Sequence, residues 1–272
     1  MAVPETVPTT VVTWNVNSLR SRLDHVLTFL RDHSPDVLCL QELKCEEKAL
    51  PKEAFTELGY NIVAHCQKTY NGVAIISPYP IDDVQMGFTD GAADPQARLI
   101  TTTVRGMRII NAYVVNGSEV GSDKYDYKLE WLARLSDELS NHHDPAQPTL
   151  LCGDFNVAVD DRDLYDPEGW AGRVLCSDPE REGVARWADW GFTDTFRQHH
   201  DEAGLYSWWD YRMGAFQRDR GLRIDHVWVT EPLVSRCSAC EVIKTPRSWE
   251  KPSDHAPVMA TFSGLEFASG KS

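Results

Sequence analysis

The chain has 272 residues, 42% of them hydrophobic and 25% charged, which is the composition of an ordinary globular protein. Its 27 basic and 41 acidic side chains give a net charge of −14, which argues against a protein that coats nucleic acid, because neutralising phosphates requires Lys and Arg. The same charge allows a local basic patch, and the excess of carboxylates suits a site that holds a hard cation.

Strand-like and helix-like segments alternate through the first half of the chain. Strands are expected at 11–14 and 37–40. A helix is expected between them, because apolar residues recur there at helical spacing before a proline: Leu23, Val26, Leu27, Leu30 and then Pro35. Further strands are expected at 61–64, 73–77, 99–104 and 108–115, the last two forming a hairpin around Arg105-Gly106-Met107.

The second half continues the alternation. A long helix is expected to present one apolar face, made of Tyr125, Leu129, Leu132, Leu135 and Leu139. After a loop at 141–148, the pattern predicts a strand at 149–152, a helix at 180–190 and strands at 224–229 and 258–262. Many strands with helices between them, and no low-complexity linker, predict an α/β domain with stacked sheets. The length leaves two separate domains as the alternative.

The termini and the cysteines bear on the compartment. The first ten residues, MAVPETVPTT, lack the basic and apolar regions of a secretory signal, and we expect a loose tail there. No apolar run reaches the roughly 18 residues of a membrane span. Seven cysteines without dense spacing indicate reduced thiols in a cytoplasm. Cys237 and Cys240 form one CxxC pair, but a structural zinc site needs a second pair of ligands, and none is visible nearby.

Polar side chains follow several of the expected strands. Open sheets bind ligands beyond one edge of their strands, so these endings are expected to meet in one cleft. Singly, each has a simpler explanation, because Asp and Asn form turns and an Asp–His pair is often a satisfied surface pair. Their joint appearance favours a site built from Asn15, Asn17, Glu42, Tyr113, Asn116, Asp154, Asn156, Asp225, Asp254 and His255.

Seven short motifs carry a family resemblance. They are TWNVNSLR (13–20), LQELK (40–44), NGVAIIS (71–77), LCGDFN (151–156), YSWWDYR (206–212), GLRIDH (221–226) and EKPSDHAPV (250–258). In this order they resemble the exonuclease III group of the endonuclease/exonuclease/phosphatase superfamily, the bacterial type of abasic-site endonucleases. GDFN is moderately specific, since phosphatases and sphingomyelinases also carry it. SWWDYR, GLRID and EKPSDHAPV are far more specific to the DNA-repair branch.

The resemblance implies a fold and a metal. The fold is a four-layer α/β sandwich, in which two mixed β-sheets pack face to face and helices flank them. A single domain is expected at 11–263, with tails at 1–10 and 264–272. The implied cofactor is Mg²⁺, with Mn²⁺ as a substitute, and Glu42 is its principal ligand. Asn17, where many relatives have an acid, assists, and Asp254 lies beside the metal or its waters.

Catalytic roles also follow from the resemblance. Cleaving a phosphodiester requires a metal to draw off charge, an activated water and donors for the transition state. Asp154 is expected to orient and activate the water, while Asn15 and Asn156 position it and the phosphate. Asp225 is expected to hold His255, which donates to a phosphate oxygen. Tyr113 offers a phenol to the phosphate or the leaving oxygen.

The segment 205–225 interleaves aromatic side chains with arginines. Aromatics stack on bases or wedge into a lesion, and arginines bind phosphates. The resemblance implies that Trp208 and Leu222 form an apolar pocket for a flipped sugar that lacks its base. Burial in the core is the alternative for Trp208, and it is expected for Trp209. The expected DNA-binding residues are Trp208, Leu222, Arg212, Arg218, Arg220, Arg223 and Asn116.

These features predict a Mg²⁺-dependent DNA-repair phosphodiesterase. It would cleave double-stranded DNA 5′ to abasic sites, and process 3′ ends as a 3′→5′ exonuclease and 3′-phosphatase, as a cytoplasmic monomer. Val115, where the family commonly has proline, and the variable segment 165–176 leave the balance of these activities open. The alternatives are restriction to 3′ ends, a phosphatase or phosphodiesterase acting on lipids or small molecules, and a DNA-binding module with a dead site. The presence of Glu42, Asp154, Asp225 and His255 argues against a dead site.

Overall fold

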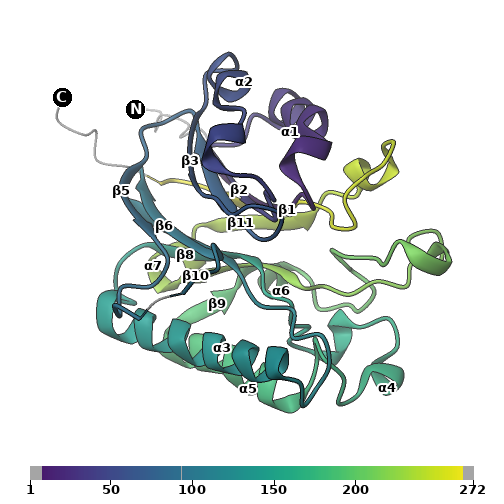
Figure 1. The fold of residues 1–272 in the computed structure, drawn as a ribbon. Helices are drawn as coiled ribbons and strands as arrows, with labels where there is room; N and C mark the ends of the chain where they lie inside the picture. The colour runs from purple at the N-terminus through teal and green to yellow at the C-terminus, as the bar shows by residue number, and fades with distance from the viewer. Residues whose placement is uncertain (1–7, 93, 266–272) are drawn as a thin grey trace, which may run out of the picture.

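A computed structural model describes residues 8–92 and 94–265, in which two six-stranded sheets lie face to face with helices on both outer sides (Figure 1). In spatial order, the first sheet consists of β11 (Cys237–Val242), β12 (Val258–Phe262), β1 (Thr9–Asn15), β2 (Val37–Gln41), β4 (Val73–Ser77) and β3 (Asn61–His65). The second consists of β5 (Asp82–Met86), β6 (Leu99–Val104), β7 (Met107–Tyr113), β8 (Thr149–Asp154), β10 (Asp225–Thr230) and β9 (Phe192–Asp194). The predicted four-layer sandwich is confirmed.

The period of a strand explains the layering. Successive side chains point to opposite faces of a sheet, so a buried strand contributes side chains to two hydrophobic cores. In β1, Val11 packs between the two sheets while Val12 packs under the outer helices. In β8, Leu150 belongs to the same inner core and Leu151 to the outer core on the other side. These two central strands are therefore apolar on both faces.

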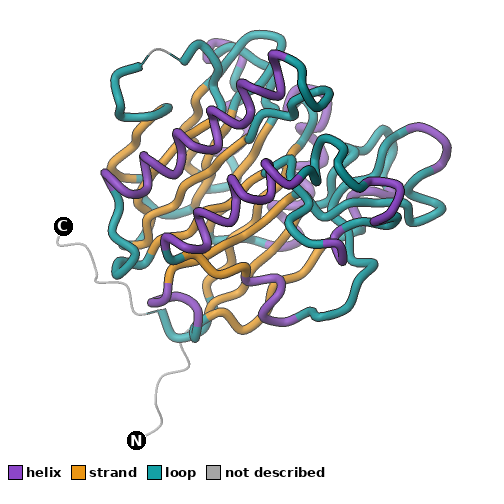
Figure 2. Tube along the Cα trace, turned by 90° about the horizontal axis from the view of Figure 1, so that it is seen from below, coloured by secondary structure: helices purple, strands orange, loops and turns teal. Residues whose placement is uncertain are grey.

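The helices form the outer layers. α1 (Leu19–His33) and α2 (Lys52–Thr56) cover the first sheet, while α3 (Asp123–His142) and α5 (Asp178–Trp190) lie side by side across the second (Figures 1 and 2). The short helices α4 (Pro167–Trp170), α6 (Thr195–His199) and α7 (Glu231–Val234) sit in connections. Among the described residues, no helix combines the length and apolarity needed to cross a membrane.

The predicted hairpin is present as a tight turn. Val104 pairs with Met107, so only Arg105 and Gly106 lie between β6 and β7. Both have positive φ, 50° and 78°, which is the type I′ geometry that matches the twist of the flanking strands. The strand expected at 108–115 ends at Tyr113, and the one expected at 224–229 runs from Asp225 to Thr230.

Three strands were not predicted from the sequence, and all three lie at sheet edges. β5 and β9 bound the second sheet and β11 bounds the first. Edge strands bury less surface and carry more polar side chains, so their apolar pattern is weak. β11 contains Cys237 and Cys240, both buried against the inner core as free thiols.

The predicted domain limits fall close to the ends of the described chain. Thr9 and Thr10 already pair with β12, so the first strand begins before the expected domain start at residue 11. Residues 1–7 of the predicted N-terminal tail, and 266–272 of the C-terminal one, lie outside the described residues.

Candidate active site

Strand register brings the polar endings together. In the second sheet, Tyr113 at the end of β7 pairs with Asp154 at the end of β8, because these strands are parallel. β10 is antiparallel to β8, so its first residue, Asp225, also pairs with Asp154. In the first sheet, Asn15 pairs with Gln41 at the ends of the parallel strands β1 and β2, and Glu42 follows directly. Two rows of polar groups therefore meet where the sheets face each other.

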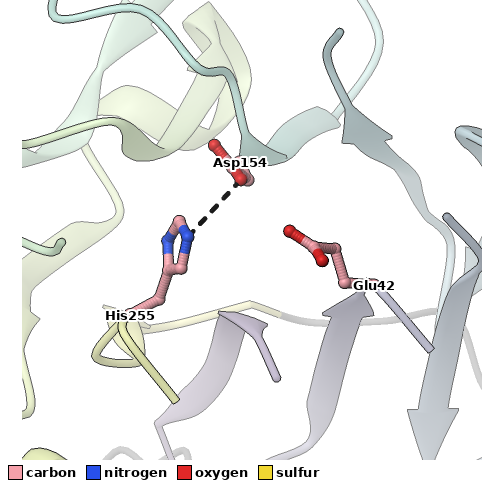
Figure 3. A group of neighbouring side chains, drawn as sticks. All are labelled: Glu42, Asp154 and His255. Atoms are coloured by element: carbon pink, nitrogen blue, oxygen red, sulfur yellow. Dashed lines mark ion pairs between the residues drawn. The ribbon is translucent and has the colours of Figure 1, made fainter. Parts of the chain in front are cut away.

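Glu42, Asp154 and His255 form the centre of the site (Figure 3). Each offers a ligand atom, and these atoms lie within 4.8 Å of one another. Asn15, which is fully buried, bridges the two sheets, because its side-chain nitrogen donates to Glu42 Oε1 and to Asp154 Oδ2 at 2.9 Å each. The Asn15 side chain therefore holds the two carboxylates at a fixed separation.

Glu42 is held as an ionised carboxylate. Its backbone has φ of 55°, which turns the side chain out of the strand direction. The Tyr113 hydroxyl donates to Oε1 at 2.9 Å, and the Lys44 ammonium pairs with Oε2 at 2.7 Å. Burial alone would raise the pKa of Glu42, but the charge and hydrogen bond of Lys44, the Asn15 amide and the His255 charge together outweigh it and lower that pKa. Burial, reinforced by Glu42, raises the pKa of Tyr113 well above its usual range, so the phenol stays a donor.

His255 is held as an imidazolium. Its Nδ1 lies 2.9 Å from Asp225 Oδ2, and its Nε2 lies 3.8 Å from Asp154 Oδ2. Burial favours the neutral ring, but Asp225 and then Asp154 outweigh it and raise the pKa of His255 to about 10. The Ser207 hydroxyl donates to Asp225 Oδ2 at 2.7 Å, which fixes the carboxylate that orients the ring. Nε2 is therefore a charged donor facing the centre of the site.

The surroundings of Asp154, in contrast, favour the neutral form of its carboxyl group. It is buried, and this burial, opposed by His255 but reinforced by Asp225 and Glu42, raises the pKa of Asp154 to about 7. Its Oδ1 accepts from the backbone N–H of Asn156 at 2.9 Å, which leaves Oδ2 turned toward His255. A carboxylate with this pKa is a base near neutral pH. The repulsion from Asp225 and Glu42 is also what a bound cation would relieve.

A divalent cation fits this donor set. Hard cations such as Mg²⁺ prefer carboxylate oxygens and keep several waters. Glu42 supplies an ionised carboxylate whose ligand atom lies within 4.8 Å of that of Asp154. Asn17 and Asp254 are not in this group. The Asn17 amide instead donates to Asp254 Oδ1 at 2.9 Å and accepts from Lys44 at 2.7 Å, so it bridges the Lys44 ammonium and Asp254.

The GDFN motif shapes the far side of the site. Gly153 has φ of 143°, and a Cβ there would lie 1.8 Å from the carbonyl oxygen of Ala112, so only glycine allows β7 and β8 to pack this closely. Asn156 has φ of 50° and accepts at its side-chain oxygen from the Asn116 amide at 3.0 Å. Asn116 is exposed, so the pair presents an amide to the surface beside Asp154.

The predicted DNA-binding residues divide into two groups. Arg212, Arg218 and Arg220 are exposed, as a phosphate contact requires, and Arg212 pairs with Asp210 at 2.8 Å. Trp209 is fully buried, which confirms it as core, whereas Trp208 is half-buried. The Trp208 indole N–H donates to Asp254 Oδ2 at 3.0 Å. Burial would raise the pKa of Asp254, but the His255 charge, and to a smaller extent this hydrogen bond, help to lower it.

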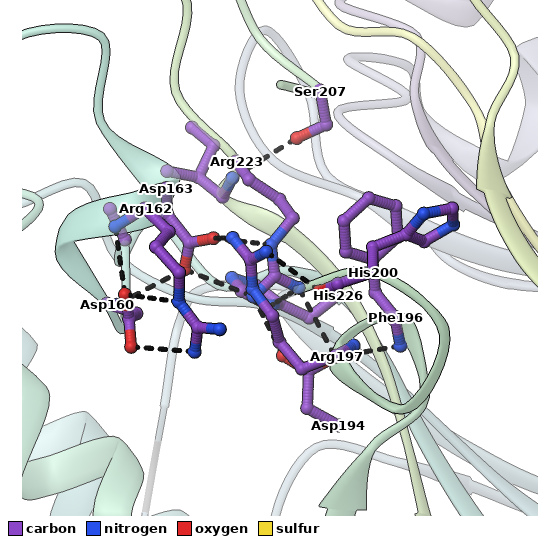
Figure 4. A network of polar contacts seen from close by, with 12 residues as sticks. Asp160, Arg162, Asp163, Asp194, Phe196, Arg197, His200, Ser207, Arg223 and His226 are labelled. Atoms are coloured by element: carbon purple, nitrogen blue, oxygen red, sulfur yellow. Dashed lines mark hydrogen bonds and ion pairs between the residues drawn. The ribbon is translucent and has the colours of Figure 1, made fainter. Parts of the chain in front are cut away.

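Two of the predicted DNA-binding residues, Leu222 and Arg223, are buried in the structure. Leu222 is 0% exposed and packs with Leu164, Leu175 and Ile224, with Trp208 against the cluster, so it does not line an open pocket. Arg223 is 1% exposed and donates to Asp163 at 2.7 Å and to Asp194 at 2.8 Å (Figure 4). A guanidinium that is enclosed by two carboxylates has no donor to offer a DNA phosphate.

The network of polar contacts around Arg223 lies next to the start of β10, the strand that begins with Asp225 (Figure 4). The Arg223 guanidinium donates to His226 Nδ1 at 3.1 Å, so the ring proton sits on Nε2, which donates to the Val157 carbonyl at 3.0 Å. Burial first, and then the Arg223 charge, lower the pKa of His226 to about 4. The network therefore requires a neutral His226 one residue from Asp225.

We expect His226 to contribute to acid sensitivity. Because its folded-state pKa lies below the unfolded value near 6.5, the contribution to stability is complete above pH 6.5 and is lost as the pH falls toward about 4. The loss amounts to about 3 kcal/mol. Denaturant unfolding of His226→Gln across this range should therefore show a flatter pH dependence than the parent chain. His142→Gln, at an exposed position, is the control. Parallel curves for the parent and His226→Gln would contradict this role.

Comparison with known proteins identifies the family. Residues 12–255 match the profile of the Endonuclease/Exonuclease/phosphatase family. Exodeoxyribonuclease III of Haemophilus influenzae is 34% identical over 263 residues, covering 92% of this chain and 98% of that protein. The 3′ phosphatase NExo from Neisseria, solved bound to a product DNA hairpin, is 43% identical with a TM-score of 0.91, covering 94% of this chain and 100% of that one. An AP endonuclease from Archaeoglobus fulgidus is 38% identical with a TM-score of 0.90, covering 93% and 99%. With the family profile spanning both the first strand and His255, the chain belongs to the endonuclease/exonuclease/phosphatase family.

Proposed function

We propose that the protein is a metal-dependent DNA-repair nuclease that cleaves 5′ to abasic sites, leaving a 3′-hydroxyl, and processes 3′ ends as an exonuclease and 3′-phosphatase. The observation that carries this proposal is the convergence of Glu42, Asp154 and His255 within 4.8 Å beside a loop with exposed arginines. The similar proteins include an exodeoxyribonuclease III, an AP endonuclease and a 3′ phosphatase bound to DNA, which supports DNA as the substrate. The seven free cysteines suit a reducing cytoplasm.

Each side chain has a task in the proposed reaction. Glu42 would hold Mg²⁺, with Mn²⁺ as a substitute, and the ion would draw charge from the phosphate when bound. Asp154 Oδ2 accepts the proton of the attacking water, which its pKa near neutrality permits. His255 Nε2 donates to a non-bridging phosphate oxygen, and Asp225 keeps that ring charged. The exposed Asn116 amide donates to the phosphate as charge builds on it, while the Tyr113 phenol donates to Glu42 and keeps that carboxylate in place.

A second candidate is restriction to 3′ ends, and the burial of Leu222 favours it. The apolar cluster expected to receive a flipped sugar is filled by the protein's own side chains, with Trp170, Val174 and Trp208 packed against Leu164 and Leu222. A terminal 3′ phosphate reaches Asp154 without a nucleotide being flipped, so it does not need that space. The abasic reaction requires the segment around Trp170 and Val174 to move.

A comparison of three duplexes tests the proposal: one with an abasic site, one with a 3′-phosphate at a nick and one with an undamaged recessed end. We expect Mg²⁺-dependent turnover on the first two, at rates that fall steeply with salt, because phosphate contacts release counterions. Faster removal of the 3′-phosphate would favour the second candidate. Intact abasic and 3′-phosphate duplexes, with Mg²⁺ present and the protein folded, would overturn both.

A further inference from the structure

We propose that Lys128 is a positioning residue that fixes Asn116 and Asn156 beside the reacting phosphate, an inference that rests on the proposed function. Lys128 lies in the second turn of α3 and is 0% exposed. Its ammonium donates to the backbone carbonyl of Asn156 at 2.7 Å and to that of Asn116 at 3.2 Å. The third donor goes to the carboxylate of Glu180 in α5. All donors of the ammonium are thus used, and none faces solvent.

A buried ammonium is a costly choice for stability alone. Burial lowers the pKa of Lys128 in spite of the Glu180 charge beside it, so part of the desolvation cost remains. Apolar side chains of similar volume often stabilise such positions as well as an ion pair does. Glu180 is also 0% exposed and accepts from the backbone N–H groups of Leu175 and Ser177, at 2.9 and 3.0 Å. The pair therefore ties together the segments around Asn116, Asn156 and Ser177.

The geometry of the site depends on two of these segments. The backbone N–H of Asn156 fixes Asp154 Oδ1, and the side-chain oxygen of Asn156 holds the Asn116 amide. Asn156 adopts φ of 50°, a left-handed conformation that asparagine tolerates better than other non-glycine residues. Gly117 completes the contact, since a Cβ there would lie 3.1 Å from Lys128 Cδ and 3.2 Å from Val174 Cγ2. Lys128 therefore sets the position of both amides from below without touching the substrate.

The test uses two double variants that both remove the charge pair. Lys128→Gln/Glu180→Gln keeps amide N–H donors for the two carbonyls, whereas Lys128→Met/Glu180→Gln offers none. We expect kcat of the Met variant to fall about 10- to 100-fold, because small misplacements of reacting groups have effects of this size, with a smaller change in KM. The Gln variant should recover most of that loss. Arg134→Met/Asp90→Asn, which removes another ion pair made by the same helix, is the control.

A second readout separates positioning from turnover. With ¹⁵N-labelled asparagine, the side-chain amide resonances of Asn116 and Asn156 should shift in the Met variant and stay near the parent positions in the Gln variant. Equal kcat values and unchanged resonances in both folded variants would overturn the proposal. If the Met variant does not fold, a Gln variant that loses more than about 10-fold in kcat with parent-like resonances would overturn it as well. A parent protein that turns over no DNA would instead refute the proposed function, while the resonances would still report on Lys128.

Discussion

Replacement of Asp154 by asparagine is expected to lower kcat on DNA by about 10³-fold or more, because it removes the carboxylate that accepts the proton of the attacking water. The amide has the same shape and keeps an oxygen for the Asn156 N–H, so the fold should persist. Single-turnover cleavage of the better DNA substrate, with saturating enzyme, measures the effect without a contribution from product release.

The stability of this variant gives an independent check. The pKa of Asp154 is raised to about 7 in the folded chain, so this group stabilises the fold only at acid pH, and the contribution is lost as the pH rises through that value. At pH 8 the Asp154→Asn variant should therefore melt no lower than the parent. Asp201→Asn, whose side chain is fully exposed, controls for the loss of a charge. An Asp154→Asn protein that is folded and retains parent-like turnover would contradict the role assigned to Asp154.

Glu42→Gln is expected to raise the Mg²⁺ concentration for half-maximal activity at least about 100-fold and to lower kcat even at saturating metal. The change keeps the acceptor for Tyr113 and Asn15 but removes the charge that a hard cation requires. Activity titrated with Mg²⁺, and calorimetry with Mg²⁺ on DNA-free protein, measure the two parts of this effect. Glu46→Gln, in the same loop and paired with Lys48, should behave as the parent. Unchanged metal dependence in Glu42→Gln would mean that the ion binds elsewhere.

The polar strand endings were the most informative part of the sequence. Parallel strands end at the same edge, so the pattern correctly gathered Asn15, Glu42, Tyr113 and Asp154 into one place. His255 lies on a loop, and its position depends on bonds that have no local signature. The Trp14 indole donates to its carbonyl at 3.2 Å, and the Ser253 hydroxyl donates to the Asn15 carbonyl at 2.7 Å. The polar endings already included His255 and the resemblance assigned its role, but neither predicted the bonds that hold it in place.

Buried charges were the least predictable part. Arg223 follows a basic, aromatic segment and resembles a surface residue, but its partners Asp163 and Asp194 lie 60 and 29 residues away in the chain. Lys128 and Glu180 likewise read as solvent-facing residues of two amphipathic helices, and they meet only because α3 packs on α5. The local sequence pattern indicates whether a residue can be exposed. Whether a charged side chain is buried depends on partners that lie far away in the chain. A lysine or arginine flanked by large apolar residues is the one hint that the sequence offered.

This centre is proposed to act on DNA rather than on small phosphoesters. The most direct measurement is kcat/KM, in one buffer with Mg²⁺, for the better of the abasic and 3′-phosphate duplexes and for p-nitrophenyl phosphate. Contacts with the DNA backbone away from the reacting phosphate should favour the duplex by at least about 10³-fold, or about 4 kcal/mol of transition-state binding. Comparable values for the two substrates, or turnover of the small phosphoester alone, would contradict the account.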